Sequence, residues 1–270
     1  MASLLSRLRR IPSRLLVDPL EGVWPKVVGF PRVDEGIPAG LRLYVIGDIH
    51  GRIDLLSQTR AKIKADRAAS GSSANCKLVY LGDYIDGGPS SREVIDAMID
   101  DEPDDVEKIT LIGNHERLLL DFLNDARTGQ KWLSVHGRTT LESYGVPVPK
   151  DQLNDSQFTT LQSALRDNLP KRHVDFIRSL RPYYICGDYA FVHAGIRPGL
   201  PISDQSLEDL LTIRSEFTSS GSKHEKIIVH GHTYSRLPRV RAYRIGIDTG
   251  SYMTGKLTCL VLERDIYRFL

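Results

Sequence analysis

Cysteine is scarce in this chain, which has three among its 270 residues. Cys76, Cys186 and Cys259 lie far apart and form no Cys-x-x-Cys pair. An odd number of dispersed cysteines fits a reducing compartment, where thiols pack as small apolar side chains. The cysteine content therefore favours a cytoplasmic protein over a disulfide-bonded one.

Long apolar runs and an excess of one charge are also missing. No run approaches the roughly 18 apolar residues of a membrane span. The formal net charge is +2, and the basic residues are scattered, so nucleic acid polymers are not expected as partners. A hydrophobic fraction of 41% is enough for a sizeable core. We therefore expect a soluble globular protein, for which nothing in the sequence sets an oligomeric state.

Residues 1–40 form a basic lead-in ahead of the first expected strand. Arginines among the first 16 residues alternate with leucine and isoleucine, a composition found in transit peptides and in amphipathic surface helices. Pro12 would interrupt a continuous helix there, and the segment lacks the apolar core and cleavage site of a secretory signal. We expect a disordered tail, followed by a single domain over residues 41–270.

The first half of that domain repeats one pattern three times: a short apolar strand, a polar tip and a helical segment. The expected strands are residues 41–46, 77–81 and 109–112. The helices expected after them are 53–69, 90–99 and 117–123. Because right-handed crossovers keep such strands parallel, their tips share one sheet edge, where open α/β sheets bind ligands.

The second half begins with a polar, helix-forming stretch over residues 129–181, which we interpret as an insertion that walls the site. Beyond it the chain becomes rich in strands, expected at 183–186, 189–192, 226–229, 243–247 and 257–262. The sequence thus predicts an α/β protein with mixed sheets flanked by helices and a site at the carboxyl ends of the strands.

The strand tips carry side chains that bind metals. They are Asp48, His50, Asp83, Asp86, Asn114, His115, Glu116, His193, His230, His232 and Asp248. Any one of them is more readily explained as a turn former or a helix cap, but capping does not explain so many together. Mixed imidazole and carboxylate ligands suit zinc, iron or manganese, and a carboxylate can bridge two ions.

Five motifs at these tips resemble, in order, the signatures of the phosphoprotein phosphatase family of calcineurin-like metallophosphoesterases. They are Gly47-Asp48-Ile49-His50-Gly51, Gly82-Asp83-Tyr84-Ile85-Asp86, Gly113-Asn114-His115-Glu116, His193-Ala194-Gly195 and Gly231-His232. The resemblance runs from about residue 41 to residue 262. It implies the metallophosphoesterase fold and the chemistry of a family that includes serine/threonine phosphatases and symmetrical dinucleoside tetraphosphatases.

The resemblance also implies two divalent metal ions, with manganese expected and iron or zinc as alternatives. The implied ligands are Asp48 and His50 for one ion, Asp83 as the bridge, and Asn114, His193 and His232 for the other. Two such cations lower the pKa of a water and neutralise phosphate oxygens. His115 would protonate the leaving oxygen, oriented by Asp86, while Arg214 and Asn114 would bind the phosphate. His230 is expected to pack beside the ligands.

One position departs from the family pattern. The second motif ordinarily has an arginine where this chain has Gly87, and that arginine contacts the substrate phosphate through two oxygens. We expect the metals to bind and the activity to be reduced, with a rate gain in Gly87→Arg. Arg52 and Arg117 adjoin metal motifs and could substitute, although solvated helix arginines explain both more readily.

The sequence therefore predicts a two-metal phosphoester hydrolase, of the serine/threonine protein phosphatase type, that acts on a phosphorylated protein or a small phosphoester. The first alternative is a hydrolase of dinucleoside polyphosphates or nucleotides, which would share the metal motifs. The second is a weakened relative that binds phosphorylated partners. Gly87 is the only support for that reading, and the intact acid and metal positions argue against it.

Overall fold

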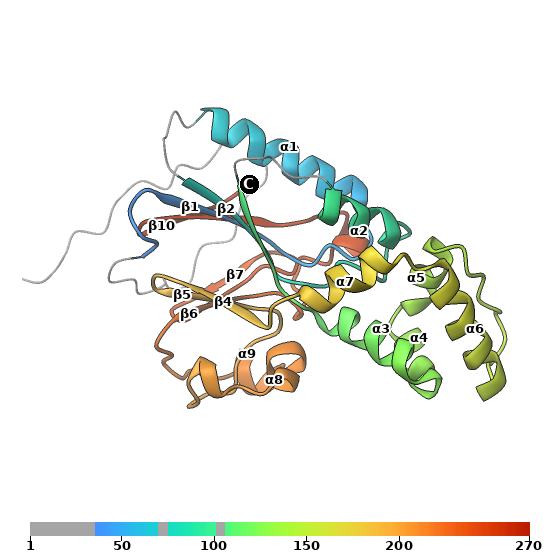
Figure 1. Cartoon of the computed structure of the whole chain (residues 1–270). Helices are drawn as coiled ribbons and strands as arrows, with labels where there is room; N and C mark the ends of the chain where they lie inside the picture. The colour runs from blue at the N-terminus through green and yellow to red at the C-terminus, as the bar shows by residue number, and fades with distance from the viewer. Residues whose placement is uncertain (1–35, 70–74, 101–105) are drawn as a thin grey trace, which may run out of the picture.

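The computed structural model describes residues 36–69, 75–100 and 106–270. Two five-stranded sheets lie face to face, with helices on both outer surfaces (Figure 1). The expectation of an α/β protein with mixed sheets is therefore confirmed. The basic lead-in lies outside the described residues except for its last five positions, 36–40.

The first sheet has the order β10-β9-β1-β2-β3. Its strands β1 (Leu41–Ile46), β2 (Asn75–Tyr80) and β3 (Glu107–Thr110) are parallel. Strand β9 (Cys259–Glu263) pairs antiparallel with β1, and β10 (Ile266–Phe269) pairs antiparallel with β9, so β10 runs in the same direction as β1. The strand expected at 109–112 begins and ends two residues earlier, because Leu111 pairs only as an isolated bridge with Arg181. The parallel core of this sheet, with its three tips at one edge, matches the expectation.

Alternation along β1 explains how this sheet is covered on both faces. Leu43 and Val45 point into the layer between the sheets, whereas Tyr44 and Ile46 pack under the helices on the outer face. Successive strand side chains point to opposite faces, so a strand buried on both reads as a continuous apolar run. That is why β1 could be placed from sequence to the residue.

The second sheet has the order β4-β5-β6-β8-β7. Its strands are β4 (Tyr183–Cys186), β5 (Tyr189–Val192), β6 (Ile227–His230), β7 (Arg239–Arg241) and β8 (Arg244–Gly246), of which β5, β6 and β8 are parallel. Strands β7 and β10 were not expected. Both are short and lie at a sheet edge, where a weak apolar pattern suffices.

The helices fall into three groups (Figure 1). On the outer face of the first sheet are α1 (Ile53–Ala69) and α2 (Ser91–Asp100). Beside them lie α3 (Asn114–Asn124) and the helices of residues 129–181, which are α4 (Gly129–Ser134), α5 (Gly137–Ser143), α6 (Asp155–Asn168) and α7 (Lys171–Ser179). Short helices α8 (Leu207–Thr212) and α9 (Ser215–Thr218) cover the second sheet, and α10 (Ser251–Thr254) precedes β9.

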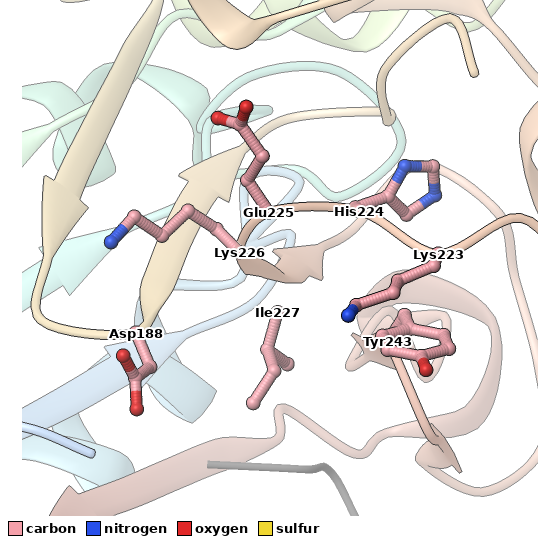
Figure 2. A pocket seen from close by; sticks show the side chains of 7 residues that line it. All are labelled: Asp188, Lys223, His224, Glu225, Lys226, Ile227 and Tyr243. Carbon is pink, nitrogen blue, oxygen red and sulfur yellow. The ribbon is translucent and has the colours of Figure 1, made fainter. Parts of the chain in front are cut away.

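A hollow of about 590 Å³ opens at the edge of the second sheet (Figure 2). Asp188, Ile227 and Tyr243 line it and stand at the beginnings of β5, β6 and β8. The polar tips of those parallel strands are at their other ends, so the hollow lies away from the candidate site. Among the described residues, no helix combines the length and the apolar character needed to cross a membrane.

Candidate metal centre

The loops after the strands hold their backbone in an unusual conformation. Six non-glycine residues in the described part of the chain have positive φ, and four of them are His50 (50°), Asp83 (51°), Asp86 (68°) and His232 (56°). Such conformations disfavour residues with a Cβ and persist only where surrounding contacts enforce them. The strain is therefore concentrated at the residues that the sequence singled out.

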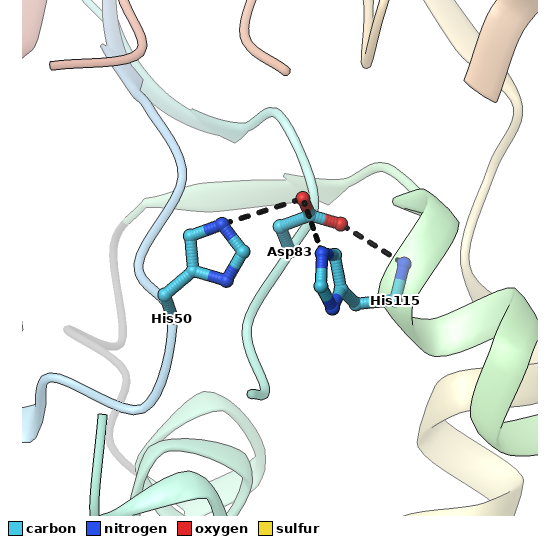
Figure 3. A group of neighbouring side chains, drawn as sticks. All are labelled: His50, Asp83 and His115. Atoms are coloured by element: carbon cyan, nitrogen blue, oxygen red, sulfur yellow. Dashed lines mark hydrogen bonds and ion pairs between the residues drawn. The ribbon is translucent and has the colours of Figure 1, made fainter. Parts of the chain in front are cut away.

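Asp83 is the centre of the cluster. Its Oδ2 lies 3.5 Å from Nε2 of His50, 3.4 Å from Nε2 of His193 and 3.8 Å from Nε2 of His115. Figure 3 shows the carboxylate between the rings of His50, from the loop after β1, and His115, from the first turn of α3. Asp83 is 2% exposed, so these imidazoles surround a buried negative charge.

Two groups of potential metal ligands share this carboxylate. One contains His50, Asp83 and His115, and the other Asp83, His193 and His232; within each group the ligand atoms lie within 4.8 Å of one another. Asn114 joins the second group, because its Oδ1 is 2.9 Å from Nε2 of His193. The structure thus gathers four of the other five proposed ligands, His50, Asn114, His193 and His232, around Asp83.

Asp48, the remaining proposed ligand, reaches the cluster from the loop after β1. Its Oδ2 accepts a hydrogen bond from the backbone N–H of His232 at 2.8 Å. Its Oδ1 lies so close to Gly231 that a Cβ there would come within 1.9 Å of it. Only glycine therefore fits before His232, which accounts for the Gly-His pair in the motif.

Two buried atoms of this cluster have no hydrogen-bond partner. Four such side-chain atoms occur among the described residues, and two are Oδ1 of Asp48 and Nε2 of His232. Leaving a buried polar atom unpaired costs about 1–3 kcal/mol, so unpaired groups call for an explanation. A carboxylate oxygen and a ring nitrogen are both metal ligands, and the residues present therefore fit divalent ions.

The imidazoles are oriented for metal binding through Nε2. Nδ1 of His193 donates to the carbonyl oxygen of Leu81 at 2.9 Å, and Nδ1 of His50 donates to that of Ile85 at 3.1 Å. A ring that donates from Nδ1 leaves the Nε2 lone pair free when neutral. Such backbone acceptors commonly fix the orientation of metal-binding histidines.

Charge coupling within the cluster shifts several pKa values. Burial raises the pKa of Asp83, but the nearby charges of His193 and His115 outweigh it and hold this pKa well below its usual range. For Asp48, burial and the charge of Asp248 raise the pKa well above its usual range. Burial and the charge of His193 lower the pKa of His232 to about 3. His232 is therefore a neutral imidazole at neutral pH.

Glu116 shapes the loop that carries Asp83. Its carboxylate accepts backbone hydrogen bonds from Gly113 and Asp83 at Oε2 (both 3.0 Å) and from Tyr84 and Ile85 at Oε1 (2.8 and 3.2 Å). Burial and the charge of Asp83 raise the pKa of Glu116 to about 7. Glu116 thus holds the strained loop in place from its position in the first turn of α3.

His115 and Asp86 form a closely bonded pair. Nδ1 of His115 lies 2.6 Å from Oδ2 of Asp86. Burial lowers the pKa of His115, but the charge of Asp83 and the hydrogen bond to Asp86 outweigh it and raise the pKa to about 10. His115 is therefore protonated at neutral pH, with Nε2 facing Asp83.

Two residues of the helical segment 129–181 hold this pair, and neither was expected at the site from the sequence. Nε1 of Trp132 donates to Oδ2 of Asp86 at 2.9 Å, and Oγ1 of Thr140 donates to Oδ1. Both are fully buried. The only indication in the sequence is that a buried tryptophan needs a hydrogen-bond acceptor for its N–H. The sequence does not identify that acceptor.

The other collected residues lie close by in different roles. His230 packs edge-on against Phe217, with ring centroids 5.1 Å apart, and belongs to neither ligand group. Asp248 accepts a hydrogen bond from the backbone of Gly250 at 2.8 Å. Both are buried, so they pack beneath the strand ends that carry the proposed ligands.

A family model described as calcineurin-like phosphoesterase matches residues 41–264. The chain belongs to the calcineurin-like phosphoesterase family. Asymmetrical bis(5'-nucleosyl)-tetraphosphatase PrpE of Bacillus mycoides (strain KBAB4) is 29% identical over 223 residues, covering 80% of this chain and 88% of that protein. PrpE of Oceanobacillus iheyensis is 27% identical over 236 residues, covering 81% and 87%.

Solved structures show the same fold. The cold-active protein-tyrosine phosphatase of a psychrophilic Shewanella species superposes with a TM-score of 0.56 at 17% identity, covering 87% of this chain and 83% of that one. At this identity the similarity establishes the architecture alone. This calcineurin-like phosphoesterase therefore shares its sandwich of sheets with that phosphatase.

The arginines near the site of this phosphoesterase differ in how they are engaged. Arg214 is exposed, and its Nη1 lies 3.4 Å from the carbonyl oxygen of His232. It forms no ion pair with the described residues. Arg52 is bonded to Asp54 and to the carbonyl of Ser251, and Arg117 pairs with Asp121. Arg214 is thus the arginine available to an anion.

Gly87 is not an empty position. Its φ is +85°, and a Cβ added there would lie 2.8–3.1 Å from ring atoms of Tyr252. Arginine at this position would need both a left-handed backbone, which costs roughly 1–2 kcal/mol for residues with a Cβ, and displacement of the tyrosine. The ring of Tyr252 occupies the start of the path that an arginine side chain would take.

Adding Mn²⁺ to chelator-treated protein is expected to raise Tm, because the ion would satisfy Asp48 and His232 only in the native state. At a free ion concentration of ~100 times the dissociation constant the gain is about 2.7 kcal/mol, or roughly 5–10 °C for a chain of this size. Differential scanning calorimetry measures it. His232→Ala should lose most of the shift and His224→Ala should retain it; a full shift in His232→Ala would contradict the assignment.

Trp132→Phe is expected to lower kcat roughly ten-fold, because Asp86 loses a donor and aligns His115 less well. The Mn²⁺-induced rise in Tm should stay unchanged. Tyr144→Phe is the matched control, since it removes another buried hydrogen bond of the helical segment, to His173, without touching Asp86. Equal kcat losses in the two variants would show that only stability was affected.

The rate gain expected from the sequence for Gly87→Arg is revised by the structure: the substitution alone is expected to lower both stability and activity, because of the positive φ and the ring of Tyr252. The informative comparison is Gly87→Arg with Tyr252→Ala against Tyr252→Ala alone, where the added guanidinium should raise kcat/KM roughly ten-fold or more. Steady-state kinetics and thermal unfolding measure both effects. If kcat/KM does not rise in the double variant, the absence of an arginine at position 87 does not limit activity.

Proposed function

We propose that this protein hydrolyses phosphoesters with two divalent metal ions, one held by Asp48 and His50, the other by Asn114, His193 and His232, and both by Asp83. The observation that carries the proposal is the sharing of Asp83 by two ligand groups. Family membership supports phosphoester hydrolysis in general. Manganese is the ion we propose, in a cytoplasmic protein whose residues 41–270 form a single domain.

When bound, such ions neutralise phosphate charge and lower the pKa of an attacking water. The chain itself supplies the acid. His115, protonated and held by Asp86 at 2.6 Å, presents Nε2 toward Asp83 and donates a proton to the leaving oxygen. Trp132 and Thr140 keep Asp86 aligned, so the proton is held at a defined position.

Phosphate binding is assigned to Arg214 and Asn114. Arg214 stands beside His232 without a carboxylate partner among the described residues, so its guanidinium is free to bind two phosphate oxygens. Asn114 offers a side-chain amide next to His193. This set has one arginine fewer than the family motif, because position 87 is glycine.

Two substrate classes remain candidates. A phosphomonoester on serine or threonine of a protein is the class that the five motifs suggest. Hydrolysis of dinucleoside polyphosphates is favoured by the relatives named bis(5'-nucleosyl)-tetraphosphatase, which match over 87–88% of their own length. The weakened binder keeps only Gly87 as support, and Tyr252 now accounts for the space there.

Manganese-loaded protein is expected to turn over at least one of an aryl phosphate, a serine phosphopeptide and a dinucleoside tetraphosphate. Asp83→Asn should abolish turnover of all three, because both ligand groups lose their shared charge. Spectrophotometric phosphate and nucleotide assays measure this. A surviving rate in Asp83→Asn would refute the two-metal proposal, and metal binding without any turnover would favour the binding protein.

Arg214→Gln should raise KM and lower kcat/KM by roughly 10- to 100-fold, as expected for one charge-assisted contact to phosphate. Arg117→Gln is the matched control, because Arg117 adjoins the third motif but pairs with Asp121. Equal effects of the two substitutions would assign the loss to general electrostatics and not to a phosphate contact.

A further inference from the structure

Helix α10 is attached directly to the loop that carries Asp48 and His50. Oγ of Ser251 donates to the carbonyl oxygen of Ile49 at 2.9 Å, and Nη1 of Arg52 donates to the carbonyl oxygen of Ser251, also at 2.9 Å. These bonds flank His50 on both sides in the sequence. The position of Tyr252, the next residue of α10, is therefore fixed relative to the metal centre.

The ring of Tyr252 joins three parts of the chain at the site. It meets His50 with ring centroids 5.1 Å apart at 73°. One ring face lies against Gly87, where a Cβ would come within 2.8 Å. The hydroxyl lies 3.2 Å from Nε2 of His136, between α4 and α5. The ring is only partly buried, so it also borders solvent.

This ring and the proposed acid, His115, contact the same imidazole. His115, the proposed acid, packs edge-on against His50 with ring centroids 4.8 Å apart, and Tyr252 packs on the same His50 ring. The ring centroids of His115 and Tyr252 therefore lie within about 10 Å of each other, a distance that a leaving group with a ring system can span. The phosphate-binding arginine of the family would have begun at Gly87, beneath the same ring.

We propose that Tyr252 is a specificity-determining residue that selects substrates whose leaving group carries a planar ring system, with a nucleoside as the biological case. This inference rests on the proposed function. An arginine at position 87 would recognise the phosphate, which all phosphoesters share. An aromatic ring recognises what is attached to the phosphate, because base–aromatic stacking contributes about 1–3 kcal/mol.

The neighbourhood of Tyr252 fits an uncharged planar group. Met253, the next residue, is 55% exposed, and Tyr234 is 41% exposed. Both lie within about 3 Å of the position that a Cβ on Gly250 would take. Exposed apolar side chains beside a polar site commonly mark a ligand surface. Serine or threonine leaving groups have no ring to place there.

The test compares full-length, manganese-loaded wild type with Tyr252→Leu, which keeps an apolar side chain and removes the ring. The substrates are a dinucleoside tetraphosphate, 4-nitrophenyl phosphate and a serine phosphopeptide. We expect kcat/KM for the two planar substrates to fall roughly ten-fold, at least five times more than for the phosphopeptide. Tyr252→Phe, which loses only the bond to His136, should retain the preference, and Thr254→Ser, which keeps the hydroxyl bond to the carbonyl oxygen of Thr249, is the control on the same helix.

Binding provides a second readout that does not depend on turnover. Calorimetry should show roughly ten-fold weaker binding of adenosine 5'-monophosphate to Tyr252→Leu, with less than a two-fold change for inorganic phosphate. Equal changes for the two ligands, or a preference that persists without the ring, would overturn the proposal. If Tyr252→Leu lowers kcat/KM for 4-nitrophenyl phosphate but not for the dinucleoside tetraphosphate, a nucleoside is not the group that Tyr252 recognises.

Failure of the proposed function looks different. In that case manganese-loaded wild type would hydrolyse none of the three substrates. The comparison of adenosine 5'-monophosphate with inorganic phosphate would then still decide whether Tyr252 recognises the planar group.

Discussion

The buried charge of Asp83 is the constraint on which the site depends. An ionised carboxylate that is 2% exposed costs several kcal/mol unless opposite charge and hydrogen bonds compensate it. Three imidazoles provide that compensation: His115 lies in the first turn of α3, and the two from loops, His50 and His193, are fixed by backbone carbonyls. The strained loops and the hold of Glu116 on their backbone follow from the need to converge on one carboxylate.

The strand-tip residues could be found from the sequence because each follows a short apolar run directly. Asp48, Asp83 and His193 sit just beyond β1, β2 and β5, so locating the strands also located them. The contacts of Trp132, Thr140 and Tyr252 could not be found in this way. Trp132 and Thr140 meet Asp86 across 46 and 54 residues, and no local pattern encodes a pairing of that separation.

Gly87 shows the difference between a motif and its surroundings. In the sequence, Gly87 stands where the second motif of the family has an arginine, which indicates a lost phosphate contact. In three dimensions Gly87 packs directly against the aromatic ring of Tyr252. Both its left-handed backbone and this close contact favour a residue without a Cβ. The sequence contained both residues but not their contact, which joins positions 165 apart in the numbering.

Helix α10 has only four residues, and glycines in the left-handed conformation cap both of its ends, Gly250 (φ 68°) and Gly255 (φ 71°). Its side chains form hydrogen bonds with the loop residues Ile49, His136 and Thr249. Substitutions within this short helix can therefore change the side chains that border the site while the metal-binding residues stay unchanged. This arrangement gives evolution a way to change what is cleaved without changing how it is cleaved.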